Sequence, residues 1–400
     1  MTEQTDRSQQ LFSVVTAFMS LFAIVGFALY GLPLFYPDFF RELGWSRQQV
    51  TSGNAYSKIA VALAFGFIAG KLVDRFGPRR SMLAGIIMAG GALIGLSYVT
   101  TLAGFYFFYV FNALGYVFGG PLPNQVLLSR WFDKARGKAM GVAYLGIGIG
   151  GTIVPALAYW LSETYGWRGA LRALGLLMIA IALPCAWFVK EPARASAAAQ
   201  QAVQSLGTIL SRRSFYFLMI GSMASIGAVG GTMQNLSLYL RLDRGFSPGD
   251  IAATFSAILA GSIVGRLTMG WLADRWAKKN VMLLIYVIVA VSIPMLVYAP
   301  TPTTVKICAV LFGIGLGGDY MIIPLMAADM YGVAVLGRVM GVVLTADSVS
   351  EAVVPMVVAG MRDSSGTYAN GFLVLVALAA IGAAAVAFLP RRGAAVTSAG

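Results

Sequence analysis

Long apolar segments recur from one end of the chain to the other, with short polar or charged segments between them. An apolar helix of about 20 residues spans the hydrocarbon core of a bilayer, so the pattern predicts twelve membrane-spanning helices. The predicted spans are residues 12–36, 47–70, 81–100, 104–129, 139–162, 168–189, 214–240, 249–271, 280–299, 305–328, 339–361 and 368–389.

The composition agrees with this pattern. Of 400 residues, 58% are hydrophobic and 11% are charged, whereas a soluble protein carries about 25% charged residues. The polar N-terminus, residues 1–10, lacks the features of a cleaved signal peptide, so the first apolar segment is expected to remain as a membrane helix. The net charge is +13. Most Lys and Arg lie in loops on the same side as both ends, which places both termini in the cytoplasm.

Several kinds of chemistry are excluded by the residue types. The sequence has no histidine, which rules out a histidine-ligated metal or a histidine proton relay. Cys185 and Cys308 both fall inside predicted spans and form neither a disulfide framework nor a metal-binding spacing. There is no nucleotide-binding loop and no nucleophile with a base, so no enzyme activity, no nucleic-acid partner and no cofactor are expected.

The chain also contains an internal repeat of 200 residues. Two groups of residues, Gly70, Leu72, Asp74, Arg75 and Gly137, Met140, Gly141, Pro155, recur as Gly270, Leu272, Asp274, Arg275 and Gly337, Met340, Gly341, Pro355. A repeat with six spans per unit predicts two six-helix bundles of parallel topology. We expect an N-terminal bundle at residues 1–190, a cytoplasmic linker at 191–213 and a C-terminal bundle at 214–400.

The loop at residues 70–80, Gly-Lys-Leu-Val-Asp-Arg-Phe-Gly-Pro-Arg-Arg, resembles the loop 2–3 signature of the major facilitator superfamily, and residues 270–279 resemble its second copy. The resemblance covers all twelve spans. It implies an all-α membrane protein of two six-helix bundles related by a pseudo-two-fold repeat. It also implies a gating latch made of Gly70, Asp74, Arg75, Gly77, Arg79, Gly270, Asp274 and Arg275. The alternative is that these charges only anchor the loops at lipid headgroups.

Five ionisable residues lie well inside the predicted spans, where such groups are candidates for function. They are Lys58, Arg266, Asp319, Asp347 and Glu351. Arg266 precedes Asp274 by eight residues and Asp347 follows Arg338 by nine, which places Arg266 and Asp347 at a similar depth.

Asp347 and Glu351 are four residues apart and share one helix face, so both should not be ionised in a poorly hydrated site. Two interpretations of Arg266 follow. It neutralises one of these carboxylates within the bundle, or it binds the carboxylate of a substrate while the nearby acids carry a proton.

A second resemblance favours the latter interpretation. Gly265-Arg266 with Gly270 and Asp274 resembles span eight of bacterial monocarboxylate and oxalate/formate-type carriers, in which an arginine here is the usual partner of the substrate carboxylate. The sequence departs from these carriers in two ways. Ser262 replaces an acidic residue that monocarboxylate carriers commonly have one turn before the arginine, and Asp347 lies near where oxalate carriers have a second cation. A monoanion taken up with a proton is therefore expected.

The remaining candidates have two interpretations each. Lys58 either contacts the anion or extends to the headgroups. Asp319 is either a second proton site or a partner of Lys58. Asn124, Tyr36 and Tyr320 either bind the rest of the substrate or hydrogen-bond between helices.

The sequence therefore predicts a monomeric secondary transporter of a small monocarboxylate, coupled to protons, in a bacterial inner membrane. The alternatives are a proton-coupled exporter of lipophilic or cationic compounds, a carboxylate exchanger, and a membrane sensor or scaffold.

Overall fold

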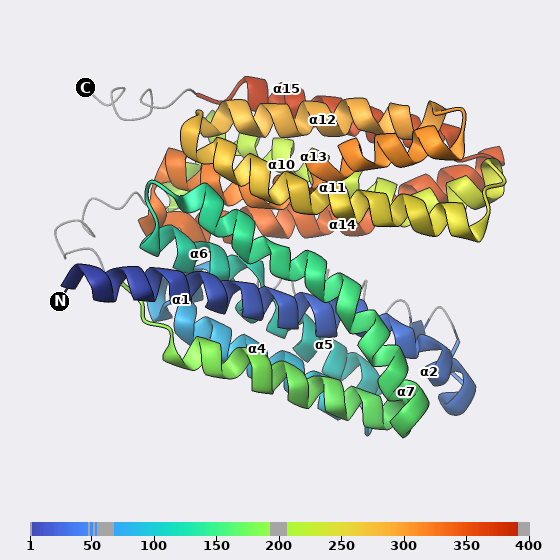
Figure 1. The fold of residues 1–400 in the computed structure, drawn as a ribbon, viewed down its shortest axis with the longest axis horizontal. Coiled ribbons are helices and arrows are strands. Elements are labelled where there is room, and N and C mark those ends of the chain that lie inside the picture. Colours follow the sequence, from blue (N-terminus) through green and yellow to red (C-terminus); the bar gives the residue numbers. More distant parts are fainter. Residues whose placement is uncertain (1, 47–48, 51–52, 54–67, 193–205, 391–400) are drawn as a thin grey trace. The chain divides into compact units, whose positions relative to one another are not determined.

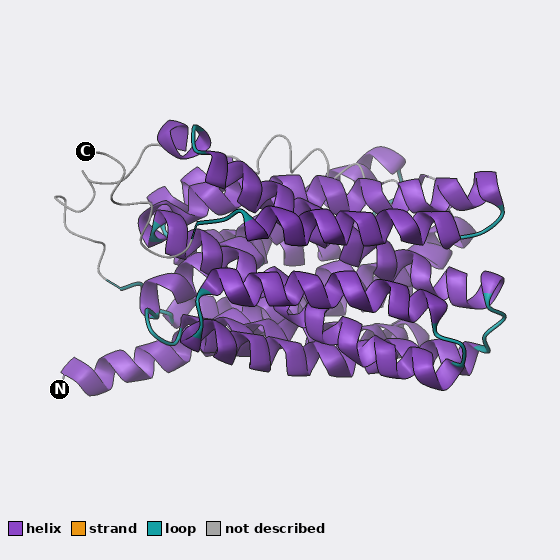
Figure 2. Ribbon diagram, turned by 90° about the horizontal axis from the view of Figure 1, so that it is seen from above, coloured by secondary structure: helices purple, strands orange, loops and turns teal. Residues whose placement is uncertain are grey.

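The computed structural model describes residues 2–46, 49–50, 53, 68–192 and 206–390. Within these residues the chain is helical and has no strand (Figure 2). The elements are α1 (Thr2–Ala23), η1 (Ile24–Gly31), η2 (Leu32–Phe35), α2 (Tyr36–Leu43), α4 (Pro78–Leu96), α5 (Leu102–Gly119), α6 (Pro121–Trp131), α7 (Arg136–Phe188), α9 (Leu206–Leu210), α10 (Arg213–Leu238), η3 (Tyr239–Asp243), α11 (Pro248–Arg275), α12 (Lys278–Tyr298), α13 (Pro302–Tyr331), η4 (Val333–Val335), α14 (Leu336–Ser365) and α15 (Ala369–Ala387).

The predicted spans correspond closely to these helices. In the described part of the chain, ten helical segments are long and apolar enough to cross a membrane. One of them, α7, contains two predicted spans. They are separated at Gly166, where φ is 67° and the backbone leaves the helical region. A helix cannot continue through a left-handed residue without a change of direction. The predicted span 47–70 lies largely outside the described residues.

One predicted span, 104–129, consists of two helices rather than one. The chain turns at Gly120, and Pro121 begins α6, where a proline ring is compatible with the first helical turn. The Asn124 side chain lies over this break and donates from Nδ2 to the carbonyl oxygens of Gly119 at 3.0 Å and Gly120 at 2.7 Å. It thereby satisfies carbonyls that the break leaves without helical partners.

The chain forms two compact units. Unit 1 comprises Met1–Asp133, Val142–Val203 and Val333–Val342, and unit 2 comprises Lys134–Gly141, Gln204–Gly332 and Val343–Gly400. The first residues of α7 therefore belong to unit 2, and the first residues of α14 belong to unit 1. Short segments from one half of the sequence are thus built into the unit that the other half forms.

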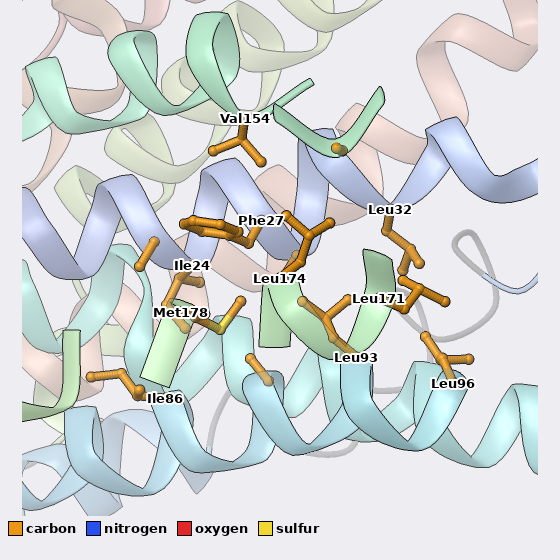
Figure 3. Close-up of a cluster of buried hydrophobic side chains, with 14 of the residues drawn as sticks. Ile24, Phe27, Leu32, Ile86, Leu93, Leu96, Val154, Leu171, Leu174 and Met178 are labelled. Atoms are coloured by element: carbon orange, nitrogen blue, oxygen red, sulfur yellow. The ribbon is translucent and has the colours of Figure 1, made fainter. Parts of the chain in front are cut away.

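The core of unit 1 is made by η1, α4 and the second part of α7. Phe27, Leu93, Leu174 and Met178 are all at most 1% exposed and point toward one another (Figure 3). Close packing of large apolar side chains on several helices is what holds a helical bundle together once it is in the membrane.

Unit 2 contains helices α10 to α13, most of α14, and α15, which Figure 1 shows in the yellow-green to red part of the chain. Helices α11 and α13 approach most closely, because glycines face the other helix. A Cβ added at Gly265 would overlap the carbonyl oxygen of Ile314, and one at Gly317 would overlap that of Ser262. Small residues at such a contact let two backbones come together. Around this pair, α10, α12 and α15 enclose the apolar core of the unit.

Candidate functional site

Arg266 lies well inside α11 and is only 6% exposed. Its Nη1 donates to the hydroxyl of Ser262, one turn earlier, at 2.9 Å. The Ser262 hydroxyl in turn donates to the carbonyl oxygen of Leu259 at 2.8 Å, so its lone pairs are directed to the guanidinium. Ser262 therefore orients Arg266 along its own helix.

Asp347 of α14 is 3% exposed, and the Ser222 hydroxyl of α10 lies 2.7 Å from both of its carboxylate oxygens. Asp347 also interacts electrostatically with Asp319 of α13 and with Glu351, one turn further along α14. Asp319, Asp347 and Glu351 thus form one group of acids contributed by α13 and α14.

Asp319 is fully buried, and its Oδ2 accepts a hydrogen bond from the Ser225 hydroxyl at 3.0 Å. Its other oxygen, Oδ1, has no hydrogen-bond partner among the described residues. The Tyr286 hydroxyl on α12 is also buried and makes no hydrogen bond at bonding distance to the described residues, but it lies near Asp319 and Asp347. Asp319 thus lies among helices α10, α12 and α14.

The first of the doubled loops positions Asp74 at the start of α14. In unit 1, Asp74 accepts from the backbone N–H groups of Gly337 at 3.1 Å and Arg338 at 3.0 Å, and from Nε of Arg338 at 3.1 Å. Gly70, one turn earlier, lies so close to Gly337 that an added Cβ would overlap its carbonyl oxygen. Burial of Asp74 raises the pKa of its carboxyl above the ordinary value, although Arg338 opposes this shift.

The second loop makes the same contact at the start of α7. In unit 2, Asp274 accepts from the N–H groups of Gly137 at 2.7 Å and Lys138 at 2.9 Å. A Cβ on Gly270 would come within 2.6 Å of the Gly137 carbonyl oxygen. In both loops a carboxylate therefore accepts from the free N–H groups at the start of another helix, where the helix dipole favours negative charge.

The other predicted latch residues lie around these two contacts. Arg75 lies over the ring of Phe76 and Arg275 over that of Trp271. Gly77 has φ 91°, a conformation that favours glycine. It allows the next helix to start so that the backbone N–H of Arg79 donates to Glu191 at 2.8 Å.

The profile of the Major Facilitator Superfamily matches residues 16–260 and 218–399. The chain belongs to this superfamily. It is accordingly a multi-pass membrane transporter, and a carrier rather than an enzyme. The predicted fold class, an all-α membrane protein with twelve spans in two six-helix bundles, is confirmed.

Among characterised proteins, rat monocarboxylate transporter 13 is 24% identical over 400 residues, covering 98% of this chain and 91% of the relative. Human monocarboxylate transporter 11 is 26% identical and covers 92% and 81%. The agnestins efflux protein of Paecilomyces divaricatus is 25% identical and covers 86% and 78%.

Two solved structures of the superfamily share the fold. FucP in the outward conformation has a TM-score of 0.73 at 15% identity, covering 95% of this chain and 98% of that one. The proton:xylose symporter XylE has a TM-score of 0.76 at 13% identity, covering 96% and 97%. At these identities the likeness concerns the fold of the superfamily.

The structure places the other predicted substrate contacts of this transporter as follows. Tyr36, at the start of α2, accepts a hydrogen bond from the hydroxyl of Tyr109 at 2.7 Å. Tyr320 is partly buried on α13, directly after Asp319. Asn124 is fully buried at the break before α6. Lys58 lies outside the described residues.

Three residues in contact with the buried acids were not predicted from the sequence: Ser222, Ser225 and Tyr286. The two serines are three residues apart on α10 and therefore share a face, and Tyr286 is the one tyrosine well inside the apolar α12. These positions were visible as polar groups in apolar segments. Which acid each would contact depended on how the helices rotate against one another.

Proposed function

We propose that this transporter moves a small organic monocarboxylate together with a proton. The observation that carries the proposal is Arg266, a buried guanidinium well inside an apolar helix. A guanidinium keeps its charge in proteins and matches a carboxylate through two parallel N–H groups. Its insertion costs at least about 2.5–3.5 kcal/mol, which an anionic substrate offsets. Two relatives named monocarboxylate transporters support this class of substrate.

In this proposal Arg266 binds the substrate carboxylate, and Asp319, Asp347 and Glu351 are the groups that accept the proton. Binding an anion and a proton together keeps the net charge of the site unchanged, which lowers the cost of moving both across the bilayer. Lys58, Asn124, Tyr36 and Tyr320 remain candidate contacts for the rest of the substrate. The Asp74 and Asp274 contacts are proposed to break and re-form as the carrier changes face.

A second candidate is a proton-coupled exporter of lipophilic or cationic compounds, which the relative named as an efflux protein favours. In that case the buried acids bind the cation and Arg266 only supports the helix. Exchange of one carboxylate for another is a variant of the first proposal, in which protons do not accompany the substrate.

The test uses purified protein in proteoliposomes, with radiolabelled short monocarboxylates, dicarboxylates and sugars at acidic and neutral external pH. We expect uptake of a monocarboxylate that increases at acidic pH and is lost in Arg266→Lys, because lysine lacks the two-pronged donor. The matched control is Arg241→Lys on the exposed η3, which should transport normally.

Each outcome separates the candidates. Normal uptake by Arg266→Lys would exclude Arg266 as the carboxylate-binding residue. Uptake that needs an internal carboxylate but ignores the pH gradient would indicate exchange. Thermal stabilisation by cationic dyes, with none by carboxylates, would indicate the exporter, since a ligand stabilises the native state by mass action.

We also propose that both termini lie in the cytoplasm, on the basis of the loop charges. The monomeric state and the bacterial cytoplasmic membrane stay predictions. In a variant without Cys185 and Cys308, a cysteine introduced at Ser8 should react only with reagents that reach the cytoplasm. A cysteine at Ser46 should react from outside. The opposite labelling pattern would reverse the orientation.

A further inference from the structure

Five polar side chains from four helices of unit 2 form one buried group, named here the Asp319 cluster. It contains Ser222 and Ser225 of α10, Tyr286 of α12, Asp319 of α13 and Asp347 of α14. Four of them are 0% exposed and Asp347 is 3% exposed. Two carboxylates in an apolar core are costly unless they are paired, hydrogen-bonded or protonated.

The serine hydroxyls of the cluster lie within hydrogen-bond distance of three of the four carboxylate oxygens. Ser222 lies 2.7 Å from both oxygens of Asp347, and Ser225 donates to Oδ2 of Asp319 at 3.0 Å. The fourth oxygen, Oδ1 of Asp319, has no partner among the described residues, and the Tyr286 hydroxyl has none either. The two are neighbours, since Tyr286 interacts with Asp319 and Ser225.

The charges around the cluster are mostly negative. Asp319 and Asp347 interact with each other, and Glu351 of α14 adds a third carboxylate near Asp347. On the helices packed around them, α12 contributes Tyr286 and α15 has no titratable side chain. Arg266 of α11 donates to the Ser262 hydroxyl, one turn earlier on its own helix. Two buried carboxylates in this position share a single proton more readily than both ionise.

We infer that Oδ1 of Asp319 is the proton-binding atom of the transporter and that the Tyr286 hydroxyl is its hydrogen-bond partner. The inference rests on the proposed proton coupling for its role in transport, but the binding of the proton itself does not require a substrate. Helix spacing pointed to Asp347 and Glu351 of α14 as the pair that shares a proton. The inference instead assigns the proton to Asp319 of α13.

Asp319 and Tyr286 can bind and release a proton while remaining hydrogen-bonded to each other. When Asp319 is protonated, its O–H donates to the Tyr286 oxygen. When the proton leaves to water, the Tyr286 hydroxyl rotates and donates to the carboxylate, so a partner is present in either state. A sodium ion fits less well, because the serine hydroxyls direct hydrogens rather than lone pairs toward these carboxylates.

The experiment measures the infrared band of protonated carboxyl groups in substrate-free purified protein, titrated over pH in a sodium-free buffer. We expect a component of this band that disappears with rising pH in the wild type and is missing from the titration of Asp319→Asn, in which Asp347 and the exposed carboxyl groups still contribute their own bands. In Asp347→Asn the same component should remain, because the proton is bound by Asp319 and not by Asp347.

Tyr286→Phe keeps the packing and removes only the hydroxyl. The band should remain but move to higher frequency, because the carboxyl loses its hydrogen-bond partner. The matched control is Tyr298→Phe at the exposed end of the same helix, which should leave the band unchanged. Comparison of Tyr286→Phe with Tyr298→Phe keeps the inference testable even if Asp319→Asn fails to fold.

Three results would overturn the inference: an unchanged band titration in Asp319→Asn, a band unaffected by Tyr286→Phe, or loss of the titrating component on adding sodium at constant pH. The last would indicate a metal cation at the cluster. Failure of the proposed function is separate, because it would appear as a normal infrared titration in a protein that transports no monocarboxylate.

Discussion

The carboxylate of Asp74 is bound twice by Arg338, through the backbone N–H at 3.0 Å and the side-chain Nε at 3.1 Å. The equivalent carboxylate 200 residues later, Asp274, accepts from the backbone N–H of Lys138 at 2.9 Å. The two loops of the repeat therefore share the contact with a helix start and differ in the added ion pair. Both contacts join residues more than 130 positions apart.

We expect Asp74→Asn to lower the melting temperature more than Asp274→Asn does. Both variants weaken the contact with helical N–H groups, which is worth about 0.5–2 kcal/mol, but only Asp74→Asn also loses a charged side-chain partner. Thermal unfolding of the purified variants measures the difference. Equal losses would show that the Arg338 side chain contributes nothing to stability, and unchanged transport by folded Asp74→Asn would exclude the latch.

The pH dependence of stability should carry a contribution from Asp74. Its pKa is raised by burial, so the folded protein binds the proton at higher pH than the unfolded chain does. Stability from this group is present at pH below the ordinary aspartate value and is lost as pH rises through the raised pKa. As the pH falls from the raised pKa of Asp74 to the ordinary aspartate value, the melting temperature of the wild type should therefore increase relative to that of Asp74→Asn. A decrease would mean that the ion pair with Arg338 outweighs burial.

Gly70→Ala and Gly270→Ala should each impair folding or transport. At both positions a Cβ would overlap the backbone of the facing helix start, and relieving such overlap costs about 1–3 kcal/mol or more. The control is Gly91→Ala on α4, where an added Cβ meets nothing within 4 Å, so it should be neutral or slightly stabilising. Normal expression, melting and transport of the two loop variants would refute the close approach.

Arg168→Gln should reduce stability without altering substrate specificity. Arg168 donates to the carbonyl oxygens of Ser97 at 2.7 Å and Val99 at 3.3 Å, at the end of α4, and lies over the Trp167 ring. Removing a charged donor from such carbonyls costs about 1–3 kcal/mol. The melting temperature should fall while the apparent substrate affinity stays unchanged. A changed affinity would show that Arg168 contributes to the substrate-binding site and does not only cap α4.

The membrane helices were predictable because hydropathy and helix length are properties of a local segment. The break at Gly166 lies in the gap between two predicted spans and follows from the backbone preference of a single glycine. The break at Gly120 was not predicted, because the apolar pattern of 104–129 runs through it. The repeat was also visible, since Asp74 and Asp274 occupy matching positions in the chain.

The partners of these residues were not predictable in the same way. Spacing along α14 grouped Asp347 with Glu351, and the fold adds Asp319 from α13, with Ser222 and Tyr286 around them. A pattern along one helix tells which residues share its face, but the rotation of that face toward a neighbour depends on how all the helices pack. The chain's own order of residues thus specified its spans, its repeat and its candidate charges, whereas tertiary packing decided which of those charges meet.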